Sequence, residues 1–282
     1  MRKFILIVNV IFVMLAGNAY AQEISNLAKS MIYFRQAQSS YEQNQFQQAI
    51  EEYTAAIKEN PNNYMAYINR GIIFFELNRY NEALKNFKKA QNIEPNNPYA
   101  YYNSAIVYNK MASTELENDN TYLYYKKAKD ELTKAIQNNP NFYKAYINRG
   151  VVNYELAFYQ DAIDDFTKAI QIKPLSYKAY YNRGIVYYTL KNLTAAESDF
   201  TNAIEINPDY ADAYFNRGLV YKQKNNVKKA LDNFYKAGIL YAQNYKIKEA
   251  YECADLIKST DEFSTLLYDL KSMITKEEIY GS

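Results

Sequence analysis

The stretch that decides the fold is YKAYINRGVVNYELAFYQDAIDDFTKAIQIKPLS, residues 143–176. The same pattern returns as YKAYYNRGIVYYTLKNLTAAESDFTNAIEINPDY at 177–210 and as ADAYFNRGLVYKQKNNVKKALDNFYKAGILYAQN at 211–244. The triplet Asn-Arg-Gly stands at 148–150, 182–184 and 216–218, with an earlier copy at 69–71. Recurrence at a spacing of 34 residues indicates an array of one repeated unit.

Five prolines fix the phase of the repeat. They lie 34, 45, 34 and 34 residues apart, at position 32 of a unit numbered 1 to 34: Pro61, Pro95, Pro140, Pro174 and Pro208. The pattern predicts six units, at 30–63, 64–97, 98–142, 143–176, 177–210 and 211–244. The third carries 11 extra residues. We expect this insertion to lengthen both helices of its unit around a turn at 118–121, as a neutral decoration or as a docking knob.

Within a unit the apolar spacing is that of two helices joined by a turn. On the first helix, one face is shared by positions 4, 7, 8 and 11, as in Tyr146, Arg149, Gly150 and Asn153. On the second, one face is shared by positions 20, 24 and 27, as in Ala162, Phe166 and Ala169. The proline then stops the second helix. Each unit is therefore predicted to be a helix hairpin.

Glycine recurs at position 8, inside the first helix, at Gly71, Gly150, Gly184 and Gly218. Glycine inside a helix costs about 1 kcal/mol relative to alanine, so its repeated use at one phase indicates a steric need. We expect a close approach of the second helix at position 20, which is Ala83, Ala162, Ala196 or Ala230.

These residues resemble the tetratricopeptide repeat (TPR) family. Its pattern has an aromatic residue at 4, Gly or Ala at 8, an aromatic residue at 11, Ala at 20, an aromatic residue at 24, Ala at 27 and Pro at 32. The resemblance covers 30–244, with Tyr in place of the usual Trp at position 4, Arg at position 7 and Ala242 in place of the last proline. It implies an all-α fold: a right-handed TPR superhelical solenoid of helix-turn-helix repeats, whose concave groove binds peptide segments.

In this family positions 2, 5, 6, 9, 12 and 13 typically face the groove. The residues thereby expected to bind a partner are Asn69, Asn103, Asn148, Asn182, Asn216, Tyr102, Tyr181, Phe215, Tyr154, Tyr188, Lys144 and Lys178. The asparagines either bond a peptide backbone or satisfy backbone groups close by. The family's clamp for a C-terminal carboxylate is not expected, because position 5 is never Lys and position 9 is never Asn.

Arginine at position 7 has two interpretations. It pairs with an acid at position 23 of the second helix, as Arg149 with Asp165 and Arg183 with Asp199, or it reaches a ligand. Position 23 is asparagine in two units, so an ion pair is not expected in every hairpin.

Residues 1–21 have the features of a bacterial signal peptide. Two basic residues precede an apolar run over 4–15, and Ala-Tyr-Ala at 19–21 is a cleavage pattern. We expect an exported protein, periplasmic or secreted, that begins at Gln22 and is not inserted in a membrane after cleavage. The alternative is an uncleaved anchor. No cysteine follows the run, so a lipoprotein is not expected.

The last residues, 245–282, lack the repeat's tyrosine, glycine and proline and are predicted to form capping helices. The first of these spans 245–258, and a capping box at 259–262 is expected to open the last helix. The single cysteine, Cys253, is interpreted as a small buried residue, with a reactive thiol as the alternative.

The composition argues against catalysis. Histidine is absent, which excludes histidine-based triads and histidine metal sites, and no phosphate-binding glycine loop occurs. We therefore expect no enzyme, no cofactor and no metal. Without Arg2 and Lys3 the chain has 31 basic residues (33 minus 2) against 31 acidic ones, so no nucleic acid partner is expected.

The function indicated by the sequence is a non-enzymatic scaffold of the bacterial cell envelope, with a segment of an unidentified protein in its groove. The alternative is a glycan or other small ligand on the same tyrosine- and asparagine-rich surface. Self-assembly through the terminal units is a third possibility, because the sequence does not set the oligomeric state.

Overall fold

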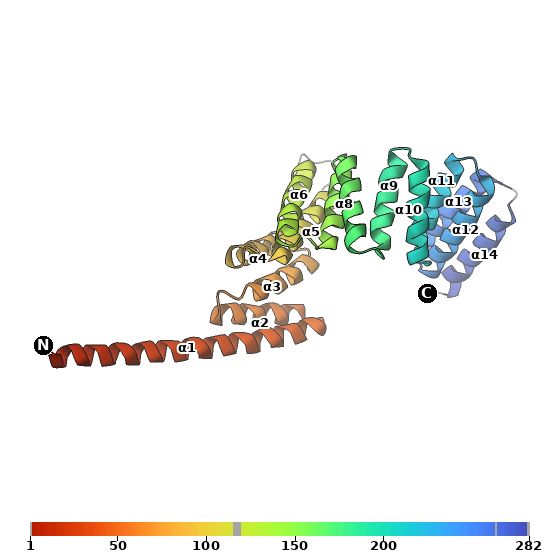
Figure 1. The fold of residues 1–282 in the computed structure, drawn as a ribbon. Helices are drawn as coiled ribbons and strands as arrows, with labels where there is room; N and C mark the ends of the chain where they lie inside the picture. Colours follow the sequence, from red (N-terminus) through yellow and green to blue (C-terminus); the bar gives the residue numbers. More distant parts are fainter. Residues whose placement is uncertain (1, 115–119, 263, 281–282) are drawn as a thin grey trace. The chain divides into compact units, whose positions relative to one another are not determined.

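A computed structural model of the protein describes residues 2–114, 120–262 and 264–280. These residues form helices joined by short turns, with no strand among them (Figure 1). The prediction of an all-α array of helix hairpins is confirmed. The chain divides into two compact units, an N-terminal unit of residues 1–140 and a C-terminal unit of residues 141–282.

In the N-terminal unit consecutive helices pack as hairpins: α1 (Arg2–Glu42) with α2 (Phe46–Glu59), α3 (Tyr64–Glu76) with α4 (Tyr80–Ile93), and α5 (Pro98–Thr114) with α6 (Asn120–Asn138). Helices α5 and α6 have 17 and 19 residues, against 13 and 14 in α3 and α4. The insertion therefore lengthens both helices of its hairpin, as predicted. Part of the expected turn, 118–119, lies outside the described residues.

In the C-terminal unit the hairpins are α7 (Tyr143–Glu155) with α8 (Tyr159–Ile172), α9 (Tyr177–Thr189) with α10 (Leu193–Ile206), and α11 (Ala211–Gln223) with α12 (Val227–Gln243). Two further helices, α13 (Ile247–Thr260) and α14 (Thr265–Tyr280), both pack on α12. Their apolar contacts join α11 and α12 in one buried cluster.

The connections between helices are as regular as the helices. Each repeat proline lies two residues beyond the end of a second helix, as Pro174 follows Ile172. Such a residue cannot continue the helix, because its ring removes the backbone donor. In the five repeat hairpins whose turns are described, the turn contains one residue with φ between 56° and 61°: Asn44, Asn78, Ala157, Lys191 and Asn225. The left-handed conformation therefore recurs at position 15.

The predicted close approach at position 8 is present, but its neighbour is different. A Cβ atom on these glycines would lie 2.6–2.8 Å from a phenylalanine Cε1 atom at position 24, in the pairs Gly71–Phe87, Gly150–Phe166, Gly184–Phe200 and Gly218–Phe234. The expectation of alanine at position 20 as the nearest neighbour is wrong, because the longer phenylalanine side chain reaches across to the first helix. Glycine leaves room for that ring.

The C-terminal end departs from the repeat where proline is missing. Helix α12 has 17 residues, against 14 in α10, and Ala242 lies inside it. The residue that follows it, Tyr245, has a φ of 57°, the value found in the turns inside hairpins. The predicted capping box at 259–262 is wrong. Ser259 belongs to α13, where its hydroxyl donates to the Leu256 carbonyl at 3.0 Å.

Helix α1 extends well beyond α2 (Figure 1). It runs without interruption from Arg2 through the expected cleavage pattern at 19–21 to Glu42. Side chains over 20–29 are exposed, or half-buried at Asn26, and Ser30 is the first buried residue. Its hydroxyl donates to the Ala56 carbonyl of α2 at 2.8 Å. Within the described part of the chain, no helix combines the length and apolar character needed to cross a membrane.

Candidate functional site

The arginines at position 7 lie inside the array. Arg183 donates from Nε to Asp199 Oδ2 at 2.8 Å and from Nη2 to Asp199 Oδ1 at 2.9 Å. Arg149 donates from Nη2 to Asp165 Oδ1 at 2.7 Å. Both acids are buried. Burial raises the pKa of Asp165, while its hydrogen bonds with Arg149 oppose that shift. The interpretation of an internal pair is therefore confirmed for these two hairpins.

Where position 23 is asparagine, the arginine binds it through the amide oxygen. Arg70 donates to Asn86 Oδ1, and Arg217 to Asn233 Oδ1, both at 2.9 Å. Arg70 also donates to Thr54 of the preceding hairpin at 2.8 Å. The same bond to a threonine at position 25 recurs at 2.9 and 3.1 Å, in the pairs Arg183–Thr167 and Arg217–Thr201. These arginines thus join neighbouring hairpins.

The arginine at position 7 contacts the ring of the tyrosine at position 4 in the same repeat. Each guanidinium carbon lies 5.5–5.7 Å from the centre of a tyrosine ring on the same helix, in the pairs Arg70–Tyr67, Arg149–Tyr146, Arg183–Tyr180 and Arg217–Tyr214. A cation over an aromatic face is attractive. The two departures from the usual repeat pattern are therefore coupled, and they serve packing.

The asparagines predicted to bind a partner are half-buried, and Asn69 and Asn216 are bonded internally. Asn69 donates to the Tyr53 hydroxyl at 3.1 Å. Asn216 donates to the Tyr181 hydroxyl at 3.1 Å and to the Asp212 carbonyl at 2.9 Å. The side chains of Asn103 and Asn182 make no hydrogen bond to another described residue, and Asn148 is half-buried.

The tyrosines at position 12 link first helices of successive hairpins. Tyr154 shares a hydrogen bond of 3.2 Å with Thr189, and Tyr188 accepts one from Gln223 at 2.5 Å. In the N-terminal unit Tyr41 donates to Glu76 at 2.5 Å. That hydrogen bond, with burial and the carboxylate charge, raises the pKa of Tyr41 to about 12. In all three pairs the tyrosine hydroxyl is bonded to the residue at position 13 of the next repeat.

At position 5 the aromatic rings pack against the array. The Tyr181 ring lies 4.9 Å from that of Tyr210, and the Phe215 ring lies 6.1 Å from that of Phe234. Burial, the nearby Asp212 charge and the Asn216 hydrogen bond act on Tyr181, and burial dominates to raise its pKa. Tyr102 is half-buried, and the lysines at position 2, Lys144 and Lys178, are exposed.

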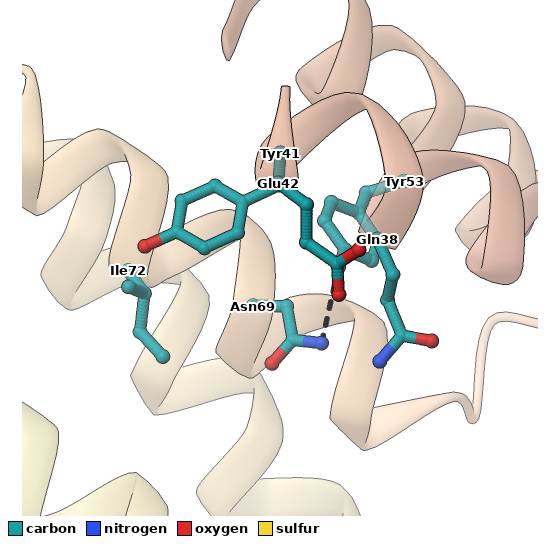
Figure 2. A pocket seen from close by; sticks show the side chains of 6 residues that line it. All are labelled: Gln38, Tyr41, Glu42, Tyr53, Asn69 and Ile72. Carbon is teal, nitrogen blue, oxygen red and sulfur yellow. Dashed lines mark hydrogen bonds between the residues drawn. The ribbon is translucent and has the colours of Figure 1, made fainter. Parts of the chain in front are cut away.

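Two hollows lie on the N-terminal unit, at positions of the repeat expected to face the groove. The first, the Glu42 cavity, has a volume of about 260 Å³ and is lined by Gln38, Tyr41, Glu42, Tyr53, Asn69 and Ile72 (Figure 2). The second, the Met31 cavity, has about 550 Å³ and is lined by Leu27, Ser30, Met31, Phe34, Arg35, Gln38, Asn60, Asn62, Asn63, Tyr64 and Met65. Gln38 lines both, so the two adjoin.

Only Asn69 among the predicted binding residues lines these hollows. The residues predicted from the sequence to bind a partner include none of the first repeat. The repeat frame itself places Met31, Gln38 and Glu42 at positions 2, 9 and 13. Their positions in the repeat are therefore the sequence feature that identifies these three residues as candidates.

The described residues contain no group of three His, Cys, Asp or Glu side chains arranged to hold a metal ion. Cys253 is fully buried, and burial raises the pKa of its thiol to about 12. The interpretation of Cys253 as a small buried residue is confirmed.

Family comparison agrees with this geometry. Models of the tetratricopeptide repeat match residues 34–101, 177–210 and 200–232. The chain belongs to the tetratricopeptide repeat family. The TPR motif thus accounts for the period, the glycines and the proline turns. A comparison with curated proteins finds no match.

Solved structures with similar folds are TPR arrays. The MamA protein is 25% identical over 65% of this chain and 94% of its own, with a TM-score of 0.55. YrrB, described as a TPR protein with an unusual peptide-binding site, is 24% identical over 78% and 97%, with a TM-score of 0.53. A TPR protein from Parabacteroides merdae is 18% identical over 88% and 99%, with a TM-score of 0.61. At these identities the likeness concerns the fold.

Proposed function

We propose that this TPR protein is a non-enzymatic scaffold that binds a peptide segment of a partner protein along its first helices. The observation that carries the proposal is the pair of adjoining hollows on the N-terminal unit. Their combined lining offers apolar side chains beside amides, which suits a peptide with both side chains and a polar backbone. The similar fold of YrrB, described as having a peptide-binding site, supports this class of ligand.

A peptide is favoured over the glycan alternative by the bonding of the polar groups. A sugar needs free amides and hydroxyls for its own hydroxyl groups. Several such groups are already bonded internally: Asn69, Asn216, Tyr154 and Tyr188. The Met31 cavity instead presents apolar side chains to a ligand: Met31 is 57% exposed and Met65 is 52% exposed.

We further propose that the protein acts in the bacterial cell envelope after removal of residues 1–21. The support is that side chains over 20–29 are exposed, or half-buried at Asn26, and that Ser30 is the first buried residue, so cleavage before Gln22 leaves the buried contacts of the first hairpin intact. Mass spectrometry of the chain expressed in a bacterium tests this. A mature protein that begins at Gln22 outside the cytoplasm is the expected result, and an intact chain in the cytoplasm contradicts it.

Selection from a displayed library of random peptides tests the peptide-binding function. Met31→Glu and Met65→Glu place a charge in the Met31 cavity and are expected to abolish binding of peptides selected on the unmodified protein. Leu175→Glu is the matched control, because Leu175 is 73% exposed and lies in a turn of the C-terminal unit. Failure to enrich any peptide, or equal binding by all variants, contradicts the proposal.

A further inference from the structure

The Glu42 cavity has an acidic character without a cation to balance it. Glu42 is exposed and makes no ion pair or hydrogen bond with another described residue. The described residues that line the cavity include no lysine or arginine. A second carboxylate, Glu76, accepts the Tyr41 hydroxyl at its edge and has no ion pair with a described residue. The two acids therefore leave a negative potential at this end of α1.

The helix adds to that potential. Glu42 is the last residue of α1, and the last turn contains no basic residue. The C-terminal end of a helix carries a partial negative charge, which attracts cations. Burial raises the pKa of Tyr53 inside the cavity, and the charge on Glu42 adds to the shift. The carboxylate thus acts on the interior of the cavity as well as on solvent.

Neutral acceptors lie beside the carboxylate. In Figure 2 the side chains of Gln38, Glu42 and Asn69 converge on one space, while Tyr41 and Ile72 form the apolar side. Asn69 uses its NH₂ group for Tyr53, and its Oδ1 atom accepts no hydrogen bond from another described residue. A lysine or arginine head needs such acceptors, and its aliphatic stem packs on apolar surface.

The adjoining Met31 cavity has a different chemistry. Leu27, Met31, Phe34 and Met65 give it an apolar lining, and Arg35 is the basic residue in it. Arg35 repels a basic side chain there, whereas Glu42, seven residues further along α1, attracts one. The two cavities therefore differ in what they accept.

We propose that the N-terminal unit selects peptide segments that place a lysine or arginine side chain in the Glu42 cavity and a large apolar side chain in the Met31 cavity. This rests on the proposed peptide-binding function and names the partner's chemistry. Arg35 and Glu42, which line one cavity each, lie seven residues apart along α1, or roughly 10 Å at about 1.5 Å per residue. An extended peptide covers that distance in about three residues.

A charge-reversal selection tests the proposal. The displayed random-peptide library is selected in parallel on the unmodified protein, on Glu42→Lys and on Glu51→Lys. Glu51 is exposed on α2 and lines neither cavity, so it provides the same change of net charge elsewhere. The unmodified protein and Glu51→Lys are expected to enrich a basic residue about three positions from an aliphatic or aromatic one. Glu42→Lys is expected to lose the basic preference and keep the apolar one.

An affinity cycle gives the second measurement. One selected peptide and its variant with glutamine in place of the basic residue are titrated against the unmodified protein and Glu42→Gln by fluorescence anisotropy. Glu42→Gln is expected to weaken the basic peptide about two- to fivefold, the range of an exposed ion pair, and to leave the glutamine peptide unchanged. Circular dichroism melting verifies that each variant folds.

The outcomes separate the two proposals. If peptides are enriched without a basic residue, or if Glu42→Lys keeps the basic preference, the charge inference is overturned and peptide binding stands. If no peptide is enriched on the unmodified protein, peptide binding is overturned, and the inference with it.

Discussion

Arg183 on α9 holds Asp199 on α10 through two hydrogen bonds, at 2.8 and 2.9 Å, and holds Thr167 of the preceding hairpin through a third at 2.9 Å. One side chain thus ties together both helices of a repeat and the repeat before it. In a linear array, where each hairpin contacts only its neighbours, such a link carries part of the coupling between repeats.

Asp199→Ala is expected to destabilise the protein by about 3 kcal/mol, because it leaves a half-buried guanidinium without its acceptor. Asp199→Asn is expected to cost only about 1 kcal/mol, since Asn86 and Asn233 hold the equivalent arginines elsewhere in the array. Urea denaturation followed by circular dichroism measures both. Equal losses for the two variants would show that the acceptor is unimportant.

Gly184→Ala is expected to destabilise by about 1–3 kcal/mol, although alanine is the better helix former. Its Cβ atom would lie 2.8 Å from Phe200 Cε1. Adding Phe200→Leu to Gly184→Ala is expected to recover part of the loss, because the same two positions of the third repeat are Ala105 and Leu132. The double-mutant cycle measures the coupling, and strictly additive effects contradict the proposed contact.

Cys253 is expected to resist thiol reagents in the folded protein even at about pH 10, where an ordinary thiol is largely ionised. The folded-state pKa of about 12 lies above the ordinary value of 9.0, so the stabilising effect of the neutral thiol is complete below about pH 9 and is lost as the pH rises through about 12. Reaction with a chromogenic disulfide, with and without urea, measures accessibility. Ser259→Cys, exposed on the same helix, is the control that should react.

Ala157→Asn is expected to stabilise the protein by roughly 0.5–1 kcal/mol. Ala157 has a φ of 60°, a conformation in which a Cβ atom is crowded and which asparagine tolerates better. Asparagine occupies this position in other hairpins, at Asn44, Asn78 and Asn225. Thermal unfolding measures the change. A lower melting temperature would mean that the left-handed turn is not a source of strain.

Much of the fold follows from the sequence because the packing repeats with it. The phase of Pro174 gives the hairpin boundaries, and the acid sixteen residues after Arg183 gives its partner. Periodicity identifies the faces of a helix, and faces determine which elements pack. It does not determine which of two side chains on a face reaches further, and for that reason Phe200 and not Ala196 is the nearest neighbour of Gly184.

The candidate site was harder to anticipate, because its side chains bond between repeats. Tyr188 and Gln223 are separated by 35 residues, so their hydrogen bond depends on how hairpins stack and not on any local pattern. The same holds for Asn216 and Tyr181. The two hollows are likewise lined by residues of successive hairpins, so they depend on three-dimensional stacking rather than on residue type alone.

Helix α12 closes the sixth hairpin and, across the left-handed turn at Tyr245, also begins the capping structure. The end of the array is therefore attached to a single repeat. Duplication of residues 177–210 ahead of Ala211 lengthens the protein without altering the interface of α12 with α13 and α14. Deletion of the sixth repeat, in contrast, removes the surface on which both terminal helices pack. A lineage of such proteins is thus free to gain or lose repeats in the interior while its last repeat and its cap are inherited together.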